Sequence, residues 1–344
     1  MGLLNLRRIG PLAYLVAAAF ALVSAWPAAA QTPLKFSLNG RLQGPEALIL
    51  LPQDRGYFKS HGLDVTVDEA TTLLEPITRV ATGGYDMAFA DINALIRYRD
   101  QHPSPPVKAV FMVYNKPPYA IVTRKSRGIT EPKQLEGKKL GAPSAGATFA
   151  QWPLFAKLNG IDVSKVTIEN IGIPVRAPML AAGQIDAALG YSFRLYVDLK
   201  DRGVPVDDIV LMPMANYGLK LYGSAIIVNP KFAAEKPEAV RKFLHVFLKG
   251  LKEAIRHPVE AVDAIAKRDD AAKREVELER LRMAIRDNIV TPEVRANGLG
   301  AVETTRLEAS IDQIGLVYTF KAKPRADDIF DASFLPPAEE RSVN

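Results

Sequence analysis

The chain has 344 residues, with 44 lysines and arginines against 38 aspartates and glutamates, and it contains no cysteine. The absence of cysteine excludes disulfides and a lipid-modified cysteine after a signal peptide. The formal net charge of +6 is moderate, and basic residues stand next to acidic ones, as in Lys267-Arg268-Asp269-Asp270. This pattern is typical of solvated helix faces, so we expect no nucleic acid as a partner.

The first 30 residues have the pattern of a cleaved signal peptide. Arg7 and Arg8 precede an apolar run over 12–23 that has no acidic residue, and three alanines follow at 28–30. A membrane anchor is the alternative, but a spanning helix needs about 20 apolar residues and this run is shorter. We therefore predict export and cleavage before Gln31. Both the Sec route and the twin-arginine route are compatible with these residues.

The remaining chain contains one pattern twice. In the first copy, a strand over 34–38 leads through a glycine-containing loop and a helix to Gly-Leu-Asp-Val at 62–65, and a buried strand follows Asp86. The second copy has the same order, with Gly-Ile-Asp-Val at 160–163 and a buried strand after Asp186. Alternating strands and helices predict an α/β fold with parallel sheets. Two such lobes that face each other form a cleft, where ligands bind.

Two β-rich segments, 119–124 and 224–229, bracket the second copy, and we interpret them as the two linking strands of a hinge. On this interpretation residues 31–124 and 219–344 form the first lobe, and residues 125–218 form the second. Two successive independent domains are the alternative, although no low-complexity linker separates them. After residue 228 the pattern is mostly helical, with apolar residues at helical spacing over 240–255.

The loop from Gly141 to Thr148 partly matches two catalytic motifs. A nucleophile elbow needs Gly-x-Ser-x-Gly, and the first interval here is one residue too long. A nucleotide P-loop needs a lysine where this chain has Ala147. What remains is a strand, small residues and a helix N-terminus, which can present backbone N–H groups to a ligand beside the Ser144 and Thr148 hydroxyls. An ordinary helix cap by Ser144 is the alternative.

Arginine and aromatic residues in the loops are further candidates for ligand contacts. Arg41, in the matching loop of the first copy, and Arg176, between two prolines, are able to pair with an anion, although an exposed arginine is more often only solvated. Tyr191 falls in a loop where its ring can stack on a planar ligand. The four histidines have no partner at metal-ligand spacing, so we expect neither a metal site nor a cofactor.

Three segments make the chain similar to the periplasmic substrate-binding proteins of ABC importers. They are Asp-Arg-Gly-Tyr-Phe-Lys-Ser-His-Gly-Leu-Asp-Val at 54–65, Ala-Thr-Gly-Gly-Tyr-Asp-Met-Ala at 81–88 and Leu-Glu-Gly-Lys-Lys-Leu-Gly at 135–141. The similarity extends over nearly the whole exported chain and is to the branch that serves nitrate, sulfonates, taurine and thiamine-pyrimidine precursors. It implies a type II-like periplasmic-binding-protein fold, in which two α/β lobes with a double-crossover hinge close on a small molecule and dock on a membrane permease.

In that family, ligand contacts come from loops after the strands of both lobes and from the approach to the hinge. Some relatives have an acidic residue in the second-lobe loop, where this chain has only small residues. We combine the positions implied by the resemblance with the two arginines above. The predicted ligand-binding residues are Asn39, Arg41, Gln43, Thr72, Asp91, Asn115, Ser144, Gly146, Thr148, Arg176, Tyr191 and Asn216.

These features predict a monomeric, non-catalytic protein of the periplasm. It would bind a small anionic or heteroaromatic molecule, such as a sulfonate, a nitrate-like anion or a pyrimidine precursor, and deliver it to an ABC permease. One alternative is an enzyme of the pyrimidine-synthase type on the same fold, but such enzymes rely on a cysteine-rich motif and this chain has no cysteine. The other alternative is a periplasmic sensor that binds the same ligand and reports to a receptor.

Overall fold

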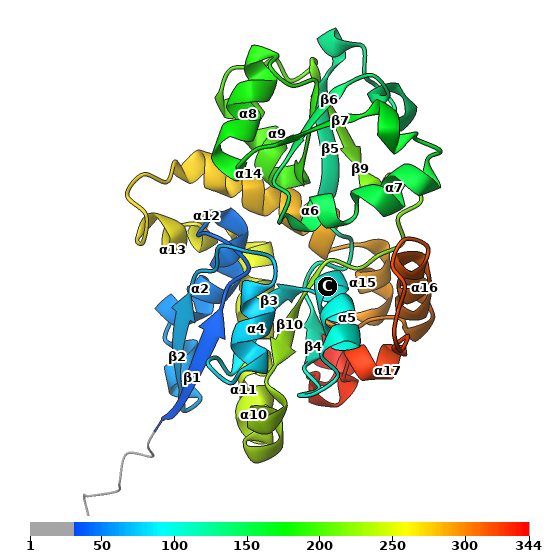
Figure 1. Cartoon of the computed structure of the whole chain (residues 1–344). Helices are drawn as coiled ribbons and strands as arrows, with labels where there is room; N and C mark the ends of the chain where they lie inside the picture. The colour runs from blue at the N-terminus through cyan, green and yellow to red at the C-terminus, as the bar shows by residue number, and fades with distance from the viewer. Residues whose placement is uncertain (1–30, 344) are drawn as a thin grey trace, which may run out of the picture.

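The computed structural model describes residues 31–343, and the predicted signal peptide lies outside them. Two five-stranded sheets form the centres of two lobes, with helices packed around each sheet (Figure 1). The strand order is β2-β1-β3-β10-β4 in the first sheet and β7-β6-β8-β5-β9 in the second. The two orders are equivalent, so the pattern that occurs twice in the sequence corresponds to two similar lobes. The predicted two-lobed α/β architecture is confirmed.

The first sheet contains parallel strands and one antiparallel strand. Its strands are β1 (Thr32–Ser37), β2 (Leu63–Asp68), β3 (Met87–Asp91), β4 (Lys108–Met112) and β10 (Ser224–Val228). Strand β1 pairs in parallel with β2 and β3, and β10 pairs antiparallel with β3 and β4. The central strands β3 and β10 are buried along their whole length, as expected for a sheet covered on both faces.

The second sheet has the same pattern of pairing. Its strands are β5 (Tyr119–Arg124), β6 (Lys139–Ala142), β7 (Thr167–Asn170), β8 (Ala187–Tyr191) and β9 (Ile209–Pro213). Strand β6 pairs in parallel with β7 and β8, and β5 pairs antiparallel with β8 and β9.

Helices of the first half of the chain connect these strands. They are α2 (Ala47–Asp54), α3 (Tyr57–Ser60), α4 (Glu75–Ala81), α5 (Ile92–Gln101), α6 (Ala147–Ala150), α7 (Trp152–Leu158), α8 (Ile173–Ala182) and α9 (Ser192–Asp201). Short 3-10 turns also occur, including η1 (Gly44–Glu46) and η5 (Met214–Tyr217).

The C-terminal part is helical, as the apolar spacing predicts. Its elements are α10 (Pro230–Glu235), α11 (Pro237–Arg256), α12 (Pro258–Ala261), α13 (Asp263–Ala266), α14 (Arg274–Ala284), the π-helical turn η6 (Ile285–Ile289), α15 (Pro292–Asn297), α16 (Thr304–Gly315) and α17 (Ala326–Ile329). The long helix α11 packs against α3 and the first sheet through Phe243, whose ring centroid lies 5.2 Å from that of Phe36 and 5.1 Å from that of Phe58. No helix within residues 31–343 is long and apolar enough to cross a membrane.

The strands expected to link the lobes each belong to one sheet. Because β5 pairs with β8 and β9, residues 119–124 belong to the second sheet and not to the first lobe, where we had placed them. Strand β10 lies in the first sheet, as expected. The chain therefore crosses between the sheets at 113–118 and again at 214–223, and the first crossing comes before Tyr119. An apolar strand satisfies its backbone hydrogen bonds equally well in either sheet, so its sequence does not show to which sheet it belongs.

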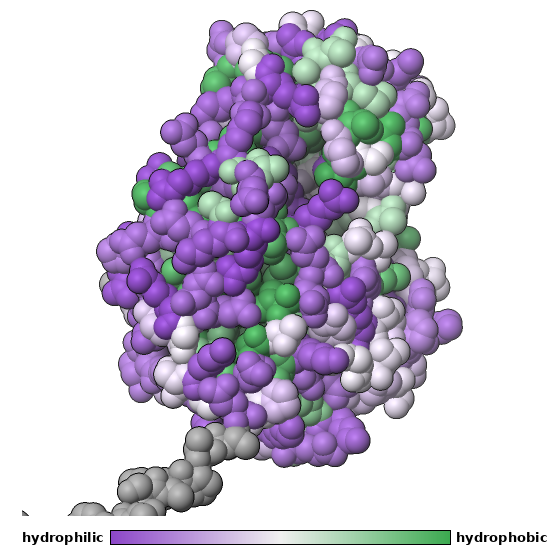
Figure 2. Space-filling view, turned by 90° about the vertical axis from the view of Figure 1, so that its left-hand side faces the viewer, coloured by the Kyte–Doolittle hydropathy of each residue, from purple (hydrophilic) through white to green (hydrophobic). Residues whose placement is uncertain are grey.

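The surface on the side of α2, α13 and α14 is mostly hydrophilic. Figure 2 shows this side, with hydrophobic residues gathered mainly in the hollow at its middle. Most apolar side chains are instead buried around the two sheets, as is usual for a folded protein in water.

Candidate ligand-binding site

The carboxyl ends of strands from the two lobes meet at one place between the sheets. Strand β3 ends at Asp91, which lies opposite Ser224 at the start of β10. Strand β8 ends at Tyr191, which lies opposite Tyr119 at the start of β5. The side chains of Asp91 and Tyr119 are hydrogen-bonded, so these two strand ends are in contact across the lobes. Ligands of open α/β sheets bind at this edge.

A buried hydrogen-bonded group joins the lobes here. The Tyr119 hydroxyl donates to the Asp91 carboxylate, and Asn93 Nδ2 donates to the Tyr119 hydroxyl oxygen at 2.9 Å. Asp91 also caps α5, because it accepts hydrogen bonds from the backbone N–H groups of Asn93 and Ala94. Burial raises the pKa of Asp91, although the hydrogen bond from Tyr119 opposes this shift. The predicted ligand contact Asp91 is thus part of a link between the lobes in this conformation.

Aromatic rings from the first crossing and from both lobes form a cluster beside the hydrogen-bonded group of Asp91 and Tyr119. The Tyr114 ring centroid lies 5.3 Å from that of Phe89 and 6.0 Å from that of Phe193. The Phe193 centroid lies 5.8 Å from that of the predicted residue Tyr191. Tyr114 and Phe193 are buried in this conformation, so their faces and edges would reach a planar ligand only if the lobes open. Phe89 lies in the first lobe and Tyr191 in the second, so a ligand that contacts both holds the lobes together.

Arg194, which is absent from the residues predicted above, reaches from the first turn of α9 to the first lobe. Its guanidinium pairs with Glu46 Oε1 at 3.1 Å and lies 5.3 Å from the Tyr191 ring centroid. Gly40 lies beside it, since a Cβ there would meet the guanidinium nitrogens at 3.4 Å, an ordinary contact distance. A basic residue in the first turn of a helix is unfavourable for the helix dipole. This unfavourable position of Arg194 is the feature of the sequence that could have indicated a functional or interlobe role.

Arg176 is a buried guanidinium with few acceptors. Its one hydrogen bond in the described part of the chain goes to the Leu189 carbonyl oxygen, and its Nε has no partner. Gly190 permits this approach, since a Cβ at that position would lie 2.6 Å from Arg176 Nη1. Burial, together with the nearby charge of Arg194, lowers the pKa of Arg176 to about 10. An anion between these two arginines would relieve their repulsion and use their free donors.

The loop after β1 places three predicted residues near this charged group. Asn39 Nδ2 donates to Ser224 Oγ at 3.2 Å, which links the loop to the start of β10. Gln43 has a buried Oε1 without a hydrogen-bond partner. Arg41 lies between them and is exposed. The loop therefore supplies Asn39 and Gln43 as neighbours of the interlobe site, whereas the Arg41 side chain lies in solvent.

The predicted residues of the loop after β6 differ in their exposure. Ser144 is exposed, and its N–H donates to Asn170 Oδ1 at 3.0 Å, while Thr148 is buried in the short helix α6. The residue before α6 is Gly146, so Ser144 does not cap this helix. A Cβ at Gly146 would lie 2.9 Å from Pro143 Cγ, so the turn itself requires glycine. A helix of four residues has little dipole, which weakens the expected anion site at its N-terminus.

Thr72 and two asparagines lie away from the interlobe group. Thr72 is exposed, and its N–H donates to Glu75 Oε2 at 3.4 Å. Asn115 lies in the first crossing, where Oδ1 accepts from Thr291 Oγ1 at 2.7 Å. Asn216 lies in the second crossing and accepts from Lys116 Nζ at 2.7 Å. The structure therefore places Asn115 and Asn216 in the hinge and does not bring them to Tyr191 and Arg176.

The buried Glu46 carboxyl makes the stability of the protein depend on pH, which allows the described burial to be tested. Burial raises its pKa from 4.5 to about 7, against the opposing charge of Arg194. Between pH 4.5 and about pH 7, the folded protein keeps a proton on Glu46 that the unfolded chain has released. The free energy of unfolding therefore falls as the pH rises over this range.

We expect Glu46→Gln, which resembles the protonated form, to gain stability relative to the wild type by on the order of 3 kcal/mol between pH 5 and pH 8. Urea unfolding of both proteins at the two pH values measures this change. Glu260→Gln, an exposed carboxyl on α12, is the control and should show almost none of it. A difference between wild type and Glu46→Gln that does not vary with pH would contradict the assigned pKa.

Comparison with known proteins relates this geometry to a family. A family model described as NMT1/THI5 like matches residues 46–261. The riboflavin-binding protein RibY of Chloroflexus aurantiacus is 28% identical over 214 residues, which cover 61% of this chain and 58% of that protein. A 4-amino-5-hydroxymethyl-2-methylpyrimidine phosphate synthase of Saccharomyces cerevisiae is 29% identical over 238 residues, which cover 66% of this chain and 68% of that enzyme. The match thus spans less than two thirds of the riboflavin-binding protein.

A solved structure shows the same fold. The periplasmic aliphatic sulphonate binding protein SsuA from Escherichia coli superposes with a TM-score of 0.69 at 11% sequence identity, and the match covers 89% of this chain and 94% of that one. The expected periplasmic-binding-protein fold is therefore confirmed. Within residues 31–343 no group of three His, Asp or Glu side chains could hold a metal ion.

Proposed function

The chain belongs to the NMT1/THI5-like family, and on this premise we propose that it is a periplasmic solute-binding protein. It captures a small anionic or heteroaromatic molecule between its two lobes and delivers it, as a monomer, to an ABC permease. Both the riboflavin-binding relative and the sulphonate-binding structural neighbour are named as binding proteins, which supports a role in binding.

The observation that carries this proposal is a pair of buried arginines, Arg176 in the second lobe and Arg194, which reaches from there to the first lobe. Within residues 31–343 Arg176 has one hydrogen bond and an Nε without a partner, and Arg194 lies near enough to lower its pKa. A buried cation without a matching anion is costly. A carboxylate or sulfonate that enters when the lobes open would accept hydrogen bonds from Arg176 and compete with Glu46 for Arg194. The aromatic cluster of Tyr114, Tyr191 and Phe193 would then contact the planar part of the ligand.

An enzyme on the same fold is the second candidate, because the yeast relative is named as a synthase. Against this candidate, the chain has no cysteine and so lacks the cysteine-rich motif that the resemblance implies for such enzymes. A binding protein should release its ligand chemically unchanged, whereas an enzyme should convert it. Mass spectrometry of the ligand before and after incubation with the protein separates the two.

The first experiment is native mass spectrometry of the exported protein, which should show a co-purified small molecule. With that molecule, calorimetry should give an affinity that Arg176→Gln lowers by about a hundredfold, since a buried charge-assisted hydrogen bond is worth about 1.5 to 3 kcal/mol. Arg202→Gln removes an exposed arginine of the same lobe and is the control. Equal affinities in the wild type and Arg176→Gln would refute the assigned site.

Closure of the lobes is a second readout. Small-angle scattering should show a smaller radius with saturating ligand, because the two crossings allow the lobes to rotate as rigid bodies. An unchanged radius would mean that the molecule binds outside the interlobe cleft. Recovery of the protein in the periplasmic fraction of the source cells would test the proposed location.

A further inference from the structure

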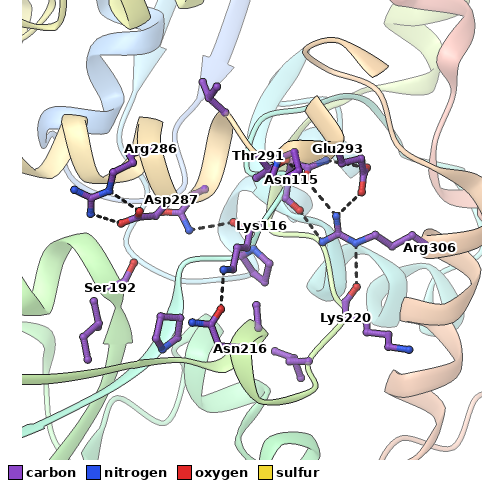
Figure 3. A pocket seen from close by; sticks show the side chains of 18 residues that line it. Asn115, Lys116, Ser192, Asn216, Lys220, Arg286, Asp287, Thr291, Glu293 and Arg306 are labelled. Atoms are coloured by element: carbon purple, nitrogen blue, oxygen red, sulfur yellow. Dashed lines mark hydrogen bonds and ion pairs between the residues drawn. The ribbon is translucent and has the colours of Figure 1, made fainter. Parts of the chain in front are cut away.

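A pocket of about 590 Å³ lies at the hinge, apart from the interlobe site (Figure 3). Asn115 and Ser192 line it, whereas their neighbours Tyr114 and Tyr191 belong to the aromatic cluster described above. We propose that this pocket is a second site, which binds a small organic anion with a carboxylate or phosphate group.

Both lobes and both crossings supply the walls of the pocket. Pro213 and Asn216 come from the second lobe and its return crossing, and Asn288 and Glu293 come from the C-terminal helices that pack on the first lobe. Lys116 lies between them in the first crossing (Figure 3). A ligand that touches both walls favours the arrangement of the lobes seen here, so its binding is coupled to their opening and closing.

The charge of the pocket is positive. Four cationic and two carboxylate side chains line it, which leaves a net charge of +2. The two carboxylates are already paired, Asp287 with Arg286 at 2.7 Å and Glu293 with Arg306 at 2.6 Å. Within residues 31–343 the Lys116 ammonium has the neutral Asn216 Oδ1 as its hydrogen-bond partner, at 2.7 Å, and no carboxylate. Lys220, which also lines the pocket, is exposed, whereas Lys116 is partly buried. We therefore assign the anion to Lys116.

A buried polar atom gives a second, independent indication of a ligand. Asn288 lines the pocket and is 3% exposed, and its Nδ2 donates to the Lys116 carbonyl oxygen at 3.1 Å. Among the described residues its buried Oδ1 has no hydrogen-bond partner. Most buried polar atoms in proteins have a hydrogen-bond partner, so the unpaired Oδ1 of Asn288 is unusual. A hydroxyl group of a ligand could donate the missing hydrogen bond. The ligand class is thus a small hydroxylated anion, with its charged group on Lys116 and its hydroxyl toward Asn288.

The test uses the exported protein freed of any co-purified molecule, with malate and glycerol 3-phosphate as probes and sulfate at equal ionic strength as the charge control. Calorimetry should show saturable binding of one organic probe, and which one binds distinguishes a carboxylate from a phosphate ligand. Lys116→Gln should weaken that binding by about tenfold or more, because a charge-assisted hydrogen bond is lost. The control Lys59→Gln removes an exposed lysine on α3 and should leave it unchanged.

Arg176→Gln separates this site from the interlobe cleft. If the probe occupies the hinge pocket, its affinity should be the same in Arg176→Gln as in the wild type. Loss of binding in Arg176→Gln with retention in Lys116→Gln would place the anion in the cleft and overturn the proposal. Absence of saturable binding by both organic probes, or binding that sulfate reproduces, would overturn it as well. None of these outcomes depends on the ligand of the interlobe cleft.

Discussion

Asp91→Ala is expected to lower the free energy of unfolding by about 3 kcal/mol, because one carboxylate has two structural roles. It caps α5 by accepting from the Asn93 and Ala94 N–H groups at 3.0 and 2.9 Å. Loss of a cap costs about 1 kcal/mol. It also accepts from the Tyr119 hydroxyl, and a buried hydroxyl left without an acceptor costs about 1 to 3 kcal/mol. Equilibrium unfolding in urea measures the change.

Asp91→Asn is the matched control for this prediction. The amide oxygen can still accept from the Asn93 and Ala94 N–H groups, whereas the amide nitrogen that replaces Oδ2 cannot accept from the Tyr119 hydroxyl. Burial already disfavours the charged form of Asp91. We therefore expect Asp91→Asn to cost less than Asp91→Ala, because it keeps the cap. Because Tyr119 and Asp91 belong to different sheets, Asp91→Ala should also increase the radius in solution without ligand. If both variants unfold like the wild type, the hydrogen-bonded group does not link the lobes.

Gly44→Ala is expected to destabilise the protein by about 3 kcal/mol or more through a clash with the backbone of α14. A Cβ at position 44 would lie 2.0 Å from the Glu277 carbonyl oxygen and 3.1 Å from the Leu281 nitrogen. The Gly44 N–H also donates to Glu277 Oε2 at 2.6 Å. Because α14 packs on both η1 and α9, its displacement would weaken a contact between the lobes.

The control is Gly172→Ala, just before α8. Its new Cβ would meet Pro174 Cδ at 3.6 Å, an ordinary contact, and its φ of −68° suits any residue. Such a substitution usually changes stability by about 0.5 kcal/mol or less. Thermal and urea unfolding of the two variants should therefore differ clearly. Equal stability of Gly44→Ala and the wild type would show that η1 and α14 lie farther apart than described.

Local patterns predicted most of the fold. The segments 34–38 and 139–142 were predicted as short apolar strands followed by loops and helices, and β1 and β6 there pair in parallel with their neighbours as expected. Each sheet also contains an antiparallel strand, which was not expected. The apolar spacing over 240–255 coincides with α11. The strand at 119–124 was assigned to the wrong lobe, because pairing between distant strands decides which sheet receives it.

The candidate site was predictable only in part, for a related reason. Position after a strand predicted Asp91 and Tyr191, which lie at the interlobe edge. Arg176 was predicted from two flanking prolines in an expected loop, and it lies instead inside helix α8. They did not reveal Arg194 or Glu46, which are 148 residues apart and meet only because α9 and η1 face each other across the lobes. Likewise, Asn115 follows Tyr114 directly but faces the hinge pocket.

The sequence by itself determined the strands, the helices and their duplication, because these depend on the spacing of apolar residues along a few turns of chain. The tertiary structure alone decided which charges are buried together. Burial and the nearby charge of Arg194 lower the pKa of Arg176, and burial raises the pKa of Glu46 against the opposing charge of Arg194. Such effects depend on the distance between charged groups in space. Residues that are far apart in the sequence come close together only when both sheets have formed.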